Sequence, residues 1–160
     1  MTILLAGCGD LGTEAGLRFH ALGHRVVGWR RSPAKLPAAI EGVAADLGAP
    51  GLPPVPADTT AVVIAVAADS PSEEAYRAAY VDGSAHVLDA LERDGVQPGR
   101  VLFVSSTAVY GVPKVHPIDE NSPLHPLGHY GSSKVVGEEL CRQYQERGLQ
   151  VNIIRPKTFL

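Results

Sequence analysis

Cysteine is scarce in this sequence, which has two among its 160 residues. Cys8 and Cys141 lie far apart, and neither has a second cysteine at the close spacing of a zinc or redox motif. A disulfide framework or a zinc site is therefore not expected, and a reducing cytoplasm fits this usage best. The loop histidines His116, His125 and His129 have no ligand spacing, so the sequence predicts no metal site.

Long apolar runs and clusters of basic residues are also missing. The apolar stretch at the N-terminus, residues 3–6, is cut by Gly7, and it is too short for a signal peptide or a membrane span. Lys and Arg total 14 and cluster only at Arg30 and Arg31. The sequence therefore predicts neither a membrane partner nor a nucleic-acid partner.

What is present is the composition of an ordinary α/β protein, with 45% hydrophobic residues, 19% charged residues and a net charge of −3. A chain of this length fits one domain, residues 1–160, and can bury most of the surface that its unfolded form exposes. Short apolar runs alternate with segments of helical periodicity. This alternation predicts a doubly wound, Rossmann-type parallel sheet of six strands in the order 3-2-1-4-5-6. Strands are expected at residues 2–6, 25–29, 42–46, 61–67, 100–105 and 150–155.

The helix expected after the fourth strand has a clear start signal. Ser70 is expected to cap it, with Pro71 at its first position and Glu73 completing a capping box. Tyr76 and Tyr80 fall on its apolar stripe, so both are predicted to pack in the core.

A glycine-rich turn joins the first strand to the first helix in the pattern G-x-G-x-x-G. In this context the first glycine permits a tight turn, the second lets a pyrophosphate approach the backbone, and the third lets the helix sit close to the sheet. The helix N-terminus then presents unpaired N–H groups and a positive dipole end to the phosphates. The predicted cofactor loop comprises Gly7, Gly9, Asp10, Leu11 and Gly12, with the Asp10 carboxylate expected to point away from the phosphates.

The end of the second strand predicts which dinucleotide is bound. An acidic residue at this place holds the ribose hydroxyls in NAD-binding folds, but here Arg30 and Arg31 follow Trp29. Guanidinium groups pair with phosphate in bidentate geometry, so the sequence favours NADP over NAD. The alternative is a solvated basic turn.

Tyr130 and Lys134 lie one turn apart on one face of a predicted helix. The ammonium group would favour the ionised form of the phenol, which suits proton transfer. Ser106 ends the fifth strand, at the carboxyl edge where open α/β sheets bind ligands. The alternative for Tyr130 and Lys134 is an exposed helix pair, and that for Ser106 is a serine satisfied locally.

Taken together, five motifs resemble the extended short-chain dehydrogenase/reductases, the NAD-dependent epimerase/dehydratase group. They are GCGDLG at residues 7–12, SSTAVYG at 105–111, DENSPLHP at 119–126, YGSSKVVGEEL at 130–140 and IIRP at 153–156. The end of the third strand, residues 45–47, and the fourth strand, residues 62–68, match as well. They occur in family order along the whole chain, so the resemblance is specific to the superfamily and not to one substrate.

The resemblance implies roles for the residues in these motifs. Tyr130 would be the general acid/base, and Lys134 would bind the nicotinamide ribose and tune Tyr130. Ser106, with Thr107 as the adjacent alternative, would hydrogen-bond the reacting hydroxyl or carbonyl of the substrate.

The resemblance also implies further cofactor contacts. Asp46 would meet the adenine amino group with Leu47 beside the ring, unless Asp46 is only a capping or loop residue. Ala65 and Ala67 would line the adenosine side, and the backbone near Pro156 would meet the nicotinamide carboxamide.

The function implied is that of an NADP-dependent enzyme that epimerises, dehydrates or reduces a nucleotide sugar or a similar hydroxyl or carbonyl substrate. The alternative is a non-catalytic dinucleotide-binding or sensor module. Family members run to about twice this length, so the C-terminal substrate domain is expected to be missing, and residues 1–160 are expected to turn over no sugar nucleotide. Relatives often pair through the helices after strands four and five, which makes a homodimer a further expectation.

Overall fold

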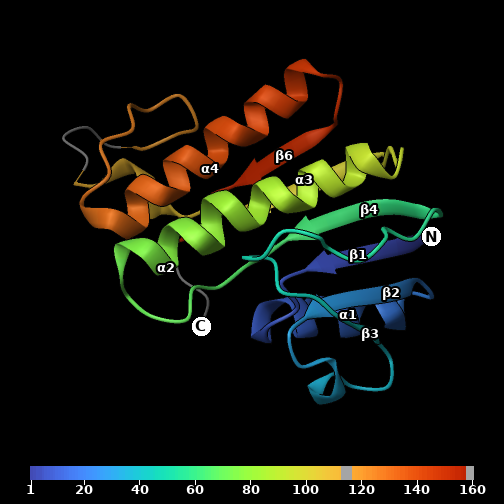
Figure 1. The fold of residues 1–160 in the computed structure, drawn as a ribbon. Helices are drawn as coiled ribbons and strands as arrows, with labels where there is room; N and C mark the ends of the chain where they lie inside the picture. Colours follow the sequence, from blue (N-terminus) through green and yellow to red (C-terminus); the bar gives the residue numbers. More distant parts are fainter. Residues whose placement is uncertain (113–116, 158–160) are drawn as a thin grey trace.

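The computed structural model describes residues 1–112 and 117–157, and a six-stranded parallel sheet forms its centre (Figure 1). The strands are hydrogen-bonded in the order β3-β2-β1-β4-β5-β6, which confirms the expected doubly wound topology. Every neighbouring pair runs parallel, as right-handed crossovers through helices require. The strands are β1 (Thr2–Ala6), β2 (Arg25–Arg30), β3 (Glu41–Ala44), β4 (Thr59–Ile64), β5 (Arg100–Val104) and β6 (Val151–Ile154).

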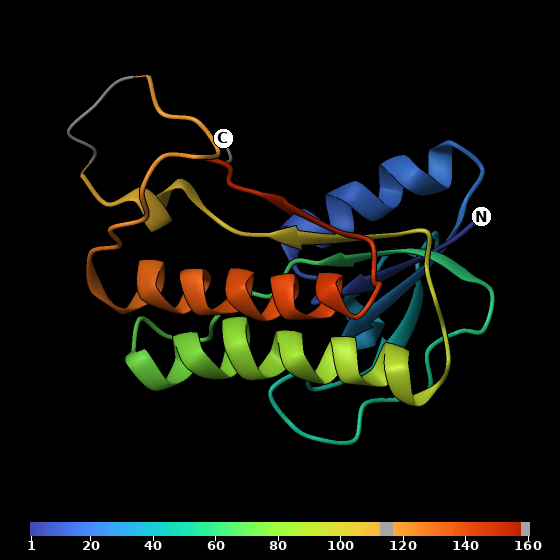
Figure 2. The same cartoon turned by 90° about the horizontal axis from the view of Figure 1, so that it is seen from above.

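The helices cover the two faces of the sheet unequally. Seen from above, α1 lies on one face, while α3 and α4 lie side by side on the other (Figure 2). The α-helices are α1 (Asp10–Ala21), α2 (Glu73–Arg77), α3 (Gly83–Arg93) and α4 (Gly128–Glu146). Three shorter helical turns are also present: the 3₁₀ turn η1 (Pro33–Lys35) between β2 and β3, the 3₁₀ turn η3 (Thr107–Tyr110) between β5 and α4, and the π-helical turn η2 (Ala78–Asp82), which links α2 to α3.

The hydrophobic core follows this division. The cluster beneath α3 and α4 is the larger, and it includes Trp29, Phe103 and Leu88, each at most 1% exposed. The cluster beneath α1 has five buried members, which are Ile3, Leu5, Cys8, Val26 and Ile40. The strands alternate between the two clusters because successive side chains point to opposite faces.

Two local expectations were wrong. The fourth strand ends at Ile64, so Ala65 and Ala67 follow it as loop residues. Ser72, and not Ser70, caps α2, because its Oγ accepts a hydrogen bond of 3.1 Å from the Ala75 N–H. Placing the cap two residues later puts the carboxylates of residues 73 and 74 in the first turn, where the helix dipole favours negative charge.

Candidate functional site at the carboxyl edge of the sheet

The turn after β1 is shaped by its first glycine. Gly7 has φ of +84°, a backbone conformation that side chains rarely adopt, and a Cβ there would lie 2.8 Å from Val66 Cα. The N–H groups of Gly7 and Cys8 both donate to the Trp29 carbonyl, at 3.2 and 2.9 Å. These bonds fix the turn against β2 without using any side chain.

The second and third glycines of the loop differ in what surrounds them. Gly9 caps α1, and a Cβ built on it would meet no atom within 4 Å, so the backbone is open to an approaching ligand. A Cβ on Gly12 would lie 3.2 Å from the Gly7 carbonyl oxygen, which explains why α1 can sit so close to the turn. The geometry thus provides a helix N-terminus with an unobstructed backbone.

A cavity of about 590 Å³ opens beside this turn. Its walls come from the glycine turn, the ends of β2 and β3, the segment after β4, and the start of the α2–η2 helix. Seven of the predicted cofactor residues line it: Gly7, Gly9, Arg30, Arg31, Asp46, Leu47 and Ala67.

The other six predicted cofactor residues are not among the residues that line this cavity. They are Asp10, Leu11, Gly12, Ala65, Lys134 and Pro156. The Asp10 side chain is exposed, and Leu11 is 37% exposed. The cavity therefore corresponds to one end of the predicted cofactor site, the end nearest β2 and β3.

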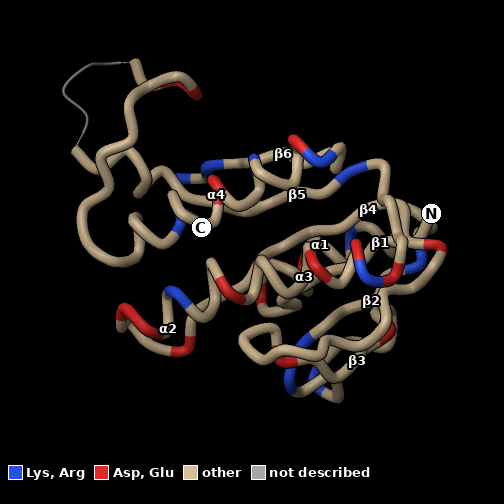
Figure 3. Tube along the Cα trace, turned by 45° about the horizontal axis from the view of Figure 1, so that its top comes forward, with Lys and Arg blue, Asp and Glu red and all other residues tan. Residues whose placement is uncertain are grey.

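Charged groups of both signs surround the cavity, and acidic and basic positions lie close together near β2 and β3 (Figure 3). Arg31 forms a bidentate ion pair with Asp69, and this hydrogen bonding lowers the pKa of the Asp69 carboxyl below its usual value. Asp46 accepts a hydrogen bond of 3.1 Å from the Gly48 N–H, so it acts as a loop-stabilising aspartate while it also lines the cavity.

At the other end of the site, α4 carries Tyr130 and Lys134. Lys134 is 4% exposed, and its Nζ donates to the Val104 carbonyl at the end of β5, at 2.9 Å. The ammonium also lies 3.8 Å from the centre of the Tyr80 ring and 5.9 Å from that of Tyr130. Burial lowers the pKa of Lys134 to about 8, although the negative charge of Glu138 acts in the opposite direction.

Three tyrosine rings meet next to this lysine. Tyr76 and Tyr80 are stacked with centroids 5.9 Å apart, and both contact Tyr130 edge-on at 5.4 and 5.6 Å. Tyr80 lies in the π-helical turn η2, and burial raises the pKa of its phenol. Tyr80 is buried as expected, whereas Tyr76 is only half-buried, and the prediction that both pack in the core did not include their contact with Tyr130.

The turn after β5 holds the predicted substrate-binding hydroxyls. Ser106 is 9% exposed, and its Oγ caps η3 by accepting a hydrogen bond of 3.1 Å from the Ala108 N–H. The same hydroxyl keeps a proton to donate. Thr107 is partly exposed, and its N–H donates to the Pro156 carbonyl, which ties this turn to the segment after β6.

Two glycines let α4 approach its neighbours closely. A Cβ on Gly131 would lie 2.7 Å from the Ala108 carbonyl oxygen of η3. A Cβ on Gly137 would lie 2.7 Å from the Tyr80 carbonyl oxygen and 2.8 Å from Cζ of Phe103. The packing of α4 against η3, η2 and β5 therefore depends on the absence of side chains at these positions.

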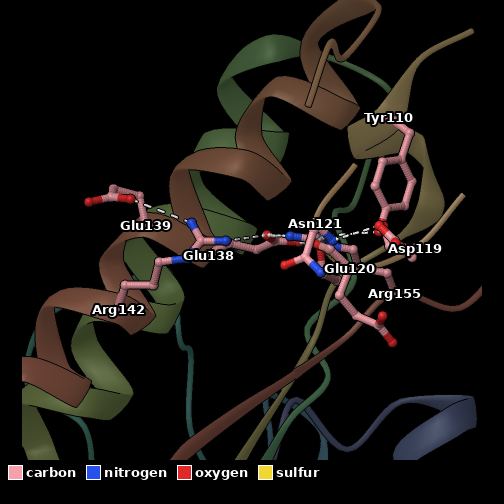
Figure 4. A network of polar contacts seen from close by, with 9 residues as sticks. Tyr110, Asp119, Glu120, Asn121, Glu138, Glu139, Arg142 and Arg155 are labelled. Atoms are coloured by element: carbon pink, nitrogen blue, oxygen red, sulfur yellow. Dashed lines mark hydrogen bonds and ion pairs between the residues drawn. The ribbon is translucent and has the colours of Figure 1, made fainter. Parts of the chain in front are cut away.

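A charge network centred on Glu138 joins α4 to Arg155 and Tyr110 (Figure 4). Glu138, on α4, is fully buried and accepts hydrogen bonds from Arg155 at 2.7 and 2.9 Å and from the Ser105 hydroxyl at 2.6 Å. Arg142 reaches the same carboxylate at 3.1 Å. Arg155 also donates to the Tyr110 hydroxyl at 2.7 Å, and that hydroxyl donates to the carbonyl of residue 119.

The electrostatics of this network are balanced by hydrogen bonds. Burial alone would raise the pKa of Glu138, but hydrogen bonds from Arg155 and Ser105 hold it below its usual value. The ionised carboxylate ties β5, α4 and the segment after β6 together directly beside Ser106. Glu138 was not among the predicted site residues, although its spacing of four from Lys134 indicates that the two share a helix face.

The sequence also predicted no metal site and no membrane span, and both points can be compared with the described residues. No group of three or more possible metal ligands occurs within residues 1–112 and 117–157. His129 Nδ1 lies 3.3 Å from the Glu73 carboxylate, and His116 falls outside the described residues. In the same ranges, no helix has the length and apolar content needed to cross a bilayer.

The model of the NAD dependent epimerase/dehydratase family matches residues 3–160. The chain belongs to this family. The assignment confirms the resemblance drawn from the five motifs, and it agrees with the parallel six-stranded sheet.

Relatives and solved structures of this kind are similar to the chain. A 79-residue segment, 48% of the chain, is 43% identical to 23% of an N-acetyl-alpha-D-glucosaminyl-diphospho-ditrans,octacis-undecaprenol 4-epimerase of Escherichia coli O157:H7. A crystal structure of UDP-galactose 4-epimerase has a TM-score of 0.83 at 24% identity, over 97% of this chain and 55% of that one. A short-chain dehydrogenase/reductase superfamily protein of Agrobacterium tumefaciens with bound NAD has a TM-score of 0.79 at 28% identity, over 97% and 48%.

The chain spans about half the length of these solved structures and a smaller share of the curated relative. The two solved structures match 97% of the chain, whereas the match to the curated relative covers 79 residues.

Proposed function

We propose that the chain is the cofactor-binding and acid/base part of an NADP-dependent epimerase, dehydratase or reductase that acts on a nucleotide sugar. The observation that carries this proposal is the buried Lys134 ammonium beside Tyr130, at the same carboxyl edge of the sheet as the glycine turn. Burying an ammonium group costs stability, and such perturbed ionisable groups cluster at functional sites. Proton transfer is a reaction that suits both Tyr130 and Lys134.

The residues at the glycine turn fit a nicotinamide dinucleotide. Gly9 leaves open the space that a Cβ would fill, and the N-terminus of α1 supplies unpaired N–H groups. Arg30 and Arg31 line the adjoining cavity, where guanidinium groups suit a 2′-phosphate. The similar structure from Agrobacterium tumefaciens holds bound NAD, which supports a dinucleotide here. The preference for NADP over NAD is argued from the two arginines alone.

The proposed chemistry assigns each residue one task. When bound, the dinucleotide accepts or returns a hydride at the substrate carbon. Tyr130 takes the proton of the substrate hydroxyl, and the Lys134 charge favours the phenolate that does so. Ser106 donates a hydrogen bond to the substrate oxygen, and Thr107 is the neighbouring alternative. A nucleotide sugar is proposed as the substrate because the similar UDP-galactose 4-epimerase acts on a sugar carried by UDP. The similar undecaprenol epimerase acts on a sugar carried by a lipid diphosphate.

The first test measures cofactor binding. Calorimetric titration of the chain is expected to give an affinity for NADP at least about tenfold above that for NAD, or about 1.4 kcal/mol. Arg30→Ala should reduce this preference because it removes one guanidinium from the cavity. Equal affinities for the two nucleotides in the unaltered chain would contradict the NADP assignment.

The second test measures turnover, in a protein that joins this chain to a substrate-holding part. Tyr130→Phe is expected to lower kcat by roughly 10²- to 10⁴-fold while the cofactor affinity stays nearly unchanged. Lys134→Ala should impair both turnover and cofactor binding. Full turnover by the Tyr130→Phe variant would contradict the acid/base role, and cofactor binding without any turnover would favour a dinucleotide-binding or sensor module.

A further inference from the structure

Two walls of the cavity are joined by one ion pair. Arg31 follows β2, and Asp69 lies in the segment between β4 and α2, 38 residues further along the chain. The two guanidinium nitrogens Nη1 and Nη2 lie 2.7 and 2.5 Å from the two carboxylate oxygens of Asp69. Both residues line the cavity, so the pair spans it next to the glycine turn.

This pair is well placed for exchange with a ligand. The side chains of Arg31 and Asp69 are 60% and 65% exposed, and exposed ion pairs contribute little to stability because water screens them. A phosphate group carries more charge than a carboxylate and offers three acceptor oxygens. A phosphate can therefore replace Asp69 as the partner of the Arg31 guanidinium, and the fold loses little stability.

Asp69 also supplies a carboxylate, a group that the end of β2 lacks. Proteins of this fold that use NAD hold the ribose hydroxyls with a carboxylate, and here that place has only Arg30 and Arg31. Of the two carboxylates that line the cavity, Asp46 already accepts the Gly48 N–H through Oδ1. Among the described residues, Arg31 is the only hydrogen-bond partner of the Asp69 carboxylate.

We propose that Asp69 sets the coenzyme selectivity of this chain, by holding Arg31 across the cavity in competition with a 2′-phosphate. The inference rests on the proposed dinucleotide-binding function and deepens it. When the ribose carries a 2′-phosphate, Arg31 leaves Asp69 and pairs with the phosphate, and the freed carboxylate repels it. When the ribose carries a hydroxyl, Asp69 is an acceptor for it. The NADP preference given by the arginines is therefore smaller than two free guanidinium groups would produce.

The experiment compares the dissociation constants of NADP and NAD by calorimetry in the 160-residue chain and two variants. Asp69→Asn removes the carboxylate charge at an exposed position and keeps the side-chain size. Glu41→Gln is the matched control, because Glu41 pairs at 2.7 Å with Arg25 at the opposite end of β2 and is similarly exposed. Both variants change the net charge equally.

In Asp69→Asn the ratio of the NAD to the NADP dissociation constant should rise by roughly tenfold, through tighter NADP and weaker NAD binding. In Glu41→Gln the ratio should stay within about twofold of the unaltered chain. Two further variants, Arg31→Gln alone and Arg31→Gln combined with Asp69→Asn, test whether Asp69 changes the ratio through Arg31. There the gain on removing the carboxylate should be clearly smaller, because the competition for the guanidinium is gone while the direct effects of Asp69 on the phosphate and the ribose hydroxyl remain.

Three results would overturn the inference. An unchanged ratio in Asp69→Asn, in a chain that binds NADP, would refute the role of Asp69 and leave the proposed function intact. An equal gain with and without Arg31 would refute the competition for that guanidinium. Failure of the unaltered chain and all variants to bind either nucleotide would refute the proposed function, and the inference with it.

Discussion

The two ends of the candidate site are built by different means. At the glycine turn the backbone provides the binding surface, and the charges around it are exposed, as in the pair of Arg31 and Asp69 at 60% and 65% exposure. At the α4 end the charges are buried, with Glu138 at 0% and Arg155 at 12% side-chain exposure. The first end can exchange its ionic partners for a ligand, whereas the second holds its side chains fixed.

This difference has a physical cause. Phosphates are recognised by N–H groups and a dipole that any sequence with the right glycines can present, so side chains there remain adjustable. Proton transfer needs a phenol, an ammonium and a hydroxyl held at fixed positions, which requires packing and buried hydrogen bonds around them. Substitutions at the α4 end should therefore affect stability far more than equivalent substitutions at the glycine turn.

The largest effect is expected from Glu138→Ala, which leaves the largely buried Arg155 without its carboxylate. Breaking a buried ion pair from one side costs about 3–5 kcal/mol of unfolding free energy. Asp69→Asn, which removes the carboxylate of the exposed pair with Arg31 at the glycine-turn end, should cost no more than about 1 kcal/mol. Urea unfolding of the two variants measures this comparison, and similar losses in both would show that the two ends do not differ as described.

A smaller effect is expected from the pH dependence of Lys134. Its pKa is about 8 in the folded chain against 10.5 as the ordinary value, so the unfolded chain binds more protons between these pH values. The cost of burying the charged lysine is complete below about pH 8 and disappears as the pH rises through about 10.5. Relative to Lys134→Met, the chain should therefore gain about 3 kcal/mol of stability over this range.

Urea unfolding at pH 7 to 10.5 checks this gain. Lys157→Met serves as the control because Lys157 is exposed, and the stability difference between the unaltered chain and this variant should show no comparable change with pH. A stability difference between the chain and Lys134→Met that stays constant with pH would contradict the lowered pKa.

The smallest effect on stability is expected at the glycine turn, from Gly9→Ala. A Cβ there meets no atom within 4 Å, so the unfolding free energy should change by less than about 0.5 kcal/mol. Dinucleotide affinity should nevertheless fall about tenfold or more, because the methyl group occupies the space that the pyrophosphate needs. Gly137→Ala is the contrasting variant, since its Cβ would meet Phe103 at 2.8 Å and should destabilise the fold by about 1–3 kcal/mol.

The sequence by itself determined the order of the strands, the position of the glycine turn and the alignment of Tyr130 with Lys134 on one helix face. These features follow from hydrophobic periodicity and from short motifs, both of which can be recognised in the sequence alone. The helix cap at Ser72 was missed because Ser70 offered a competing local signal of the same kind.

Only the tertiary structure decided which distant side chains meet. Arg31 and Asp69 are 38 residues apart, and Glu138 reaches both Ser105, 33 residues earlier, and Arg155, 17 residues later. Such contacts depend on how side chains from distant segments pack at the strand ends and on how closely glycines let α4 approach the sheet, and no local pattern specifies either. The π-turn at η2, which brings Tyr80 under Lys134, is likewise set by packing, because helix propensity does not distinguish a π-turn from an α-turn at that point.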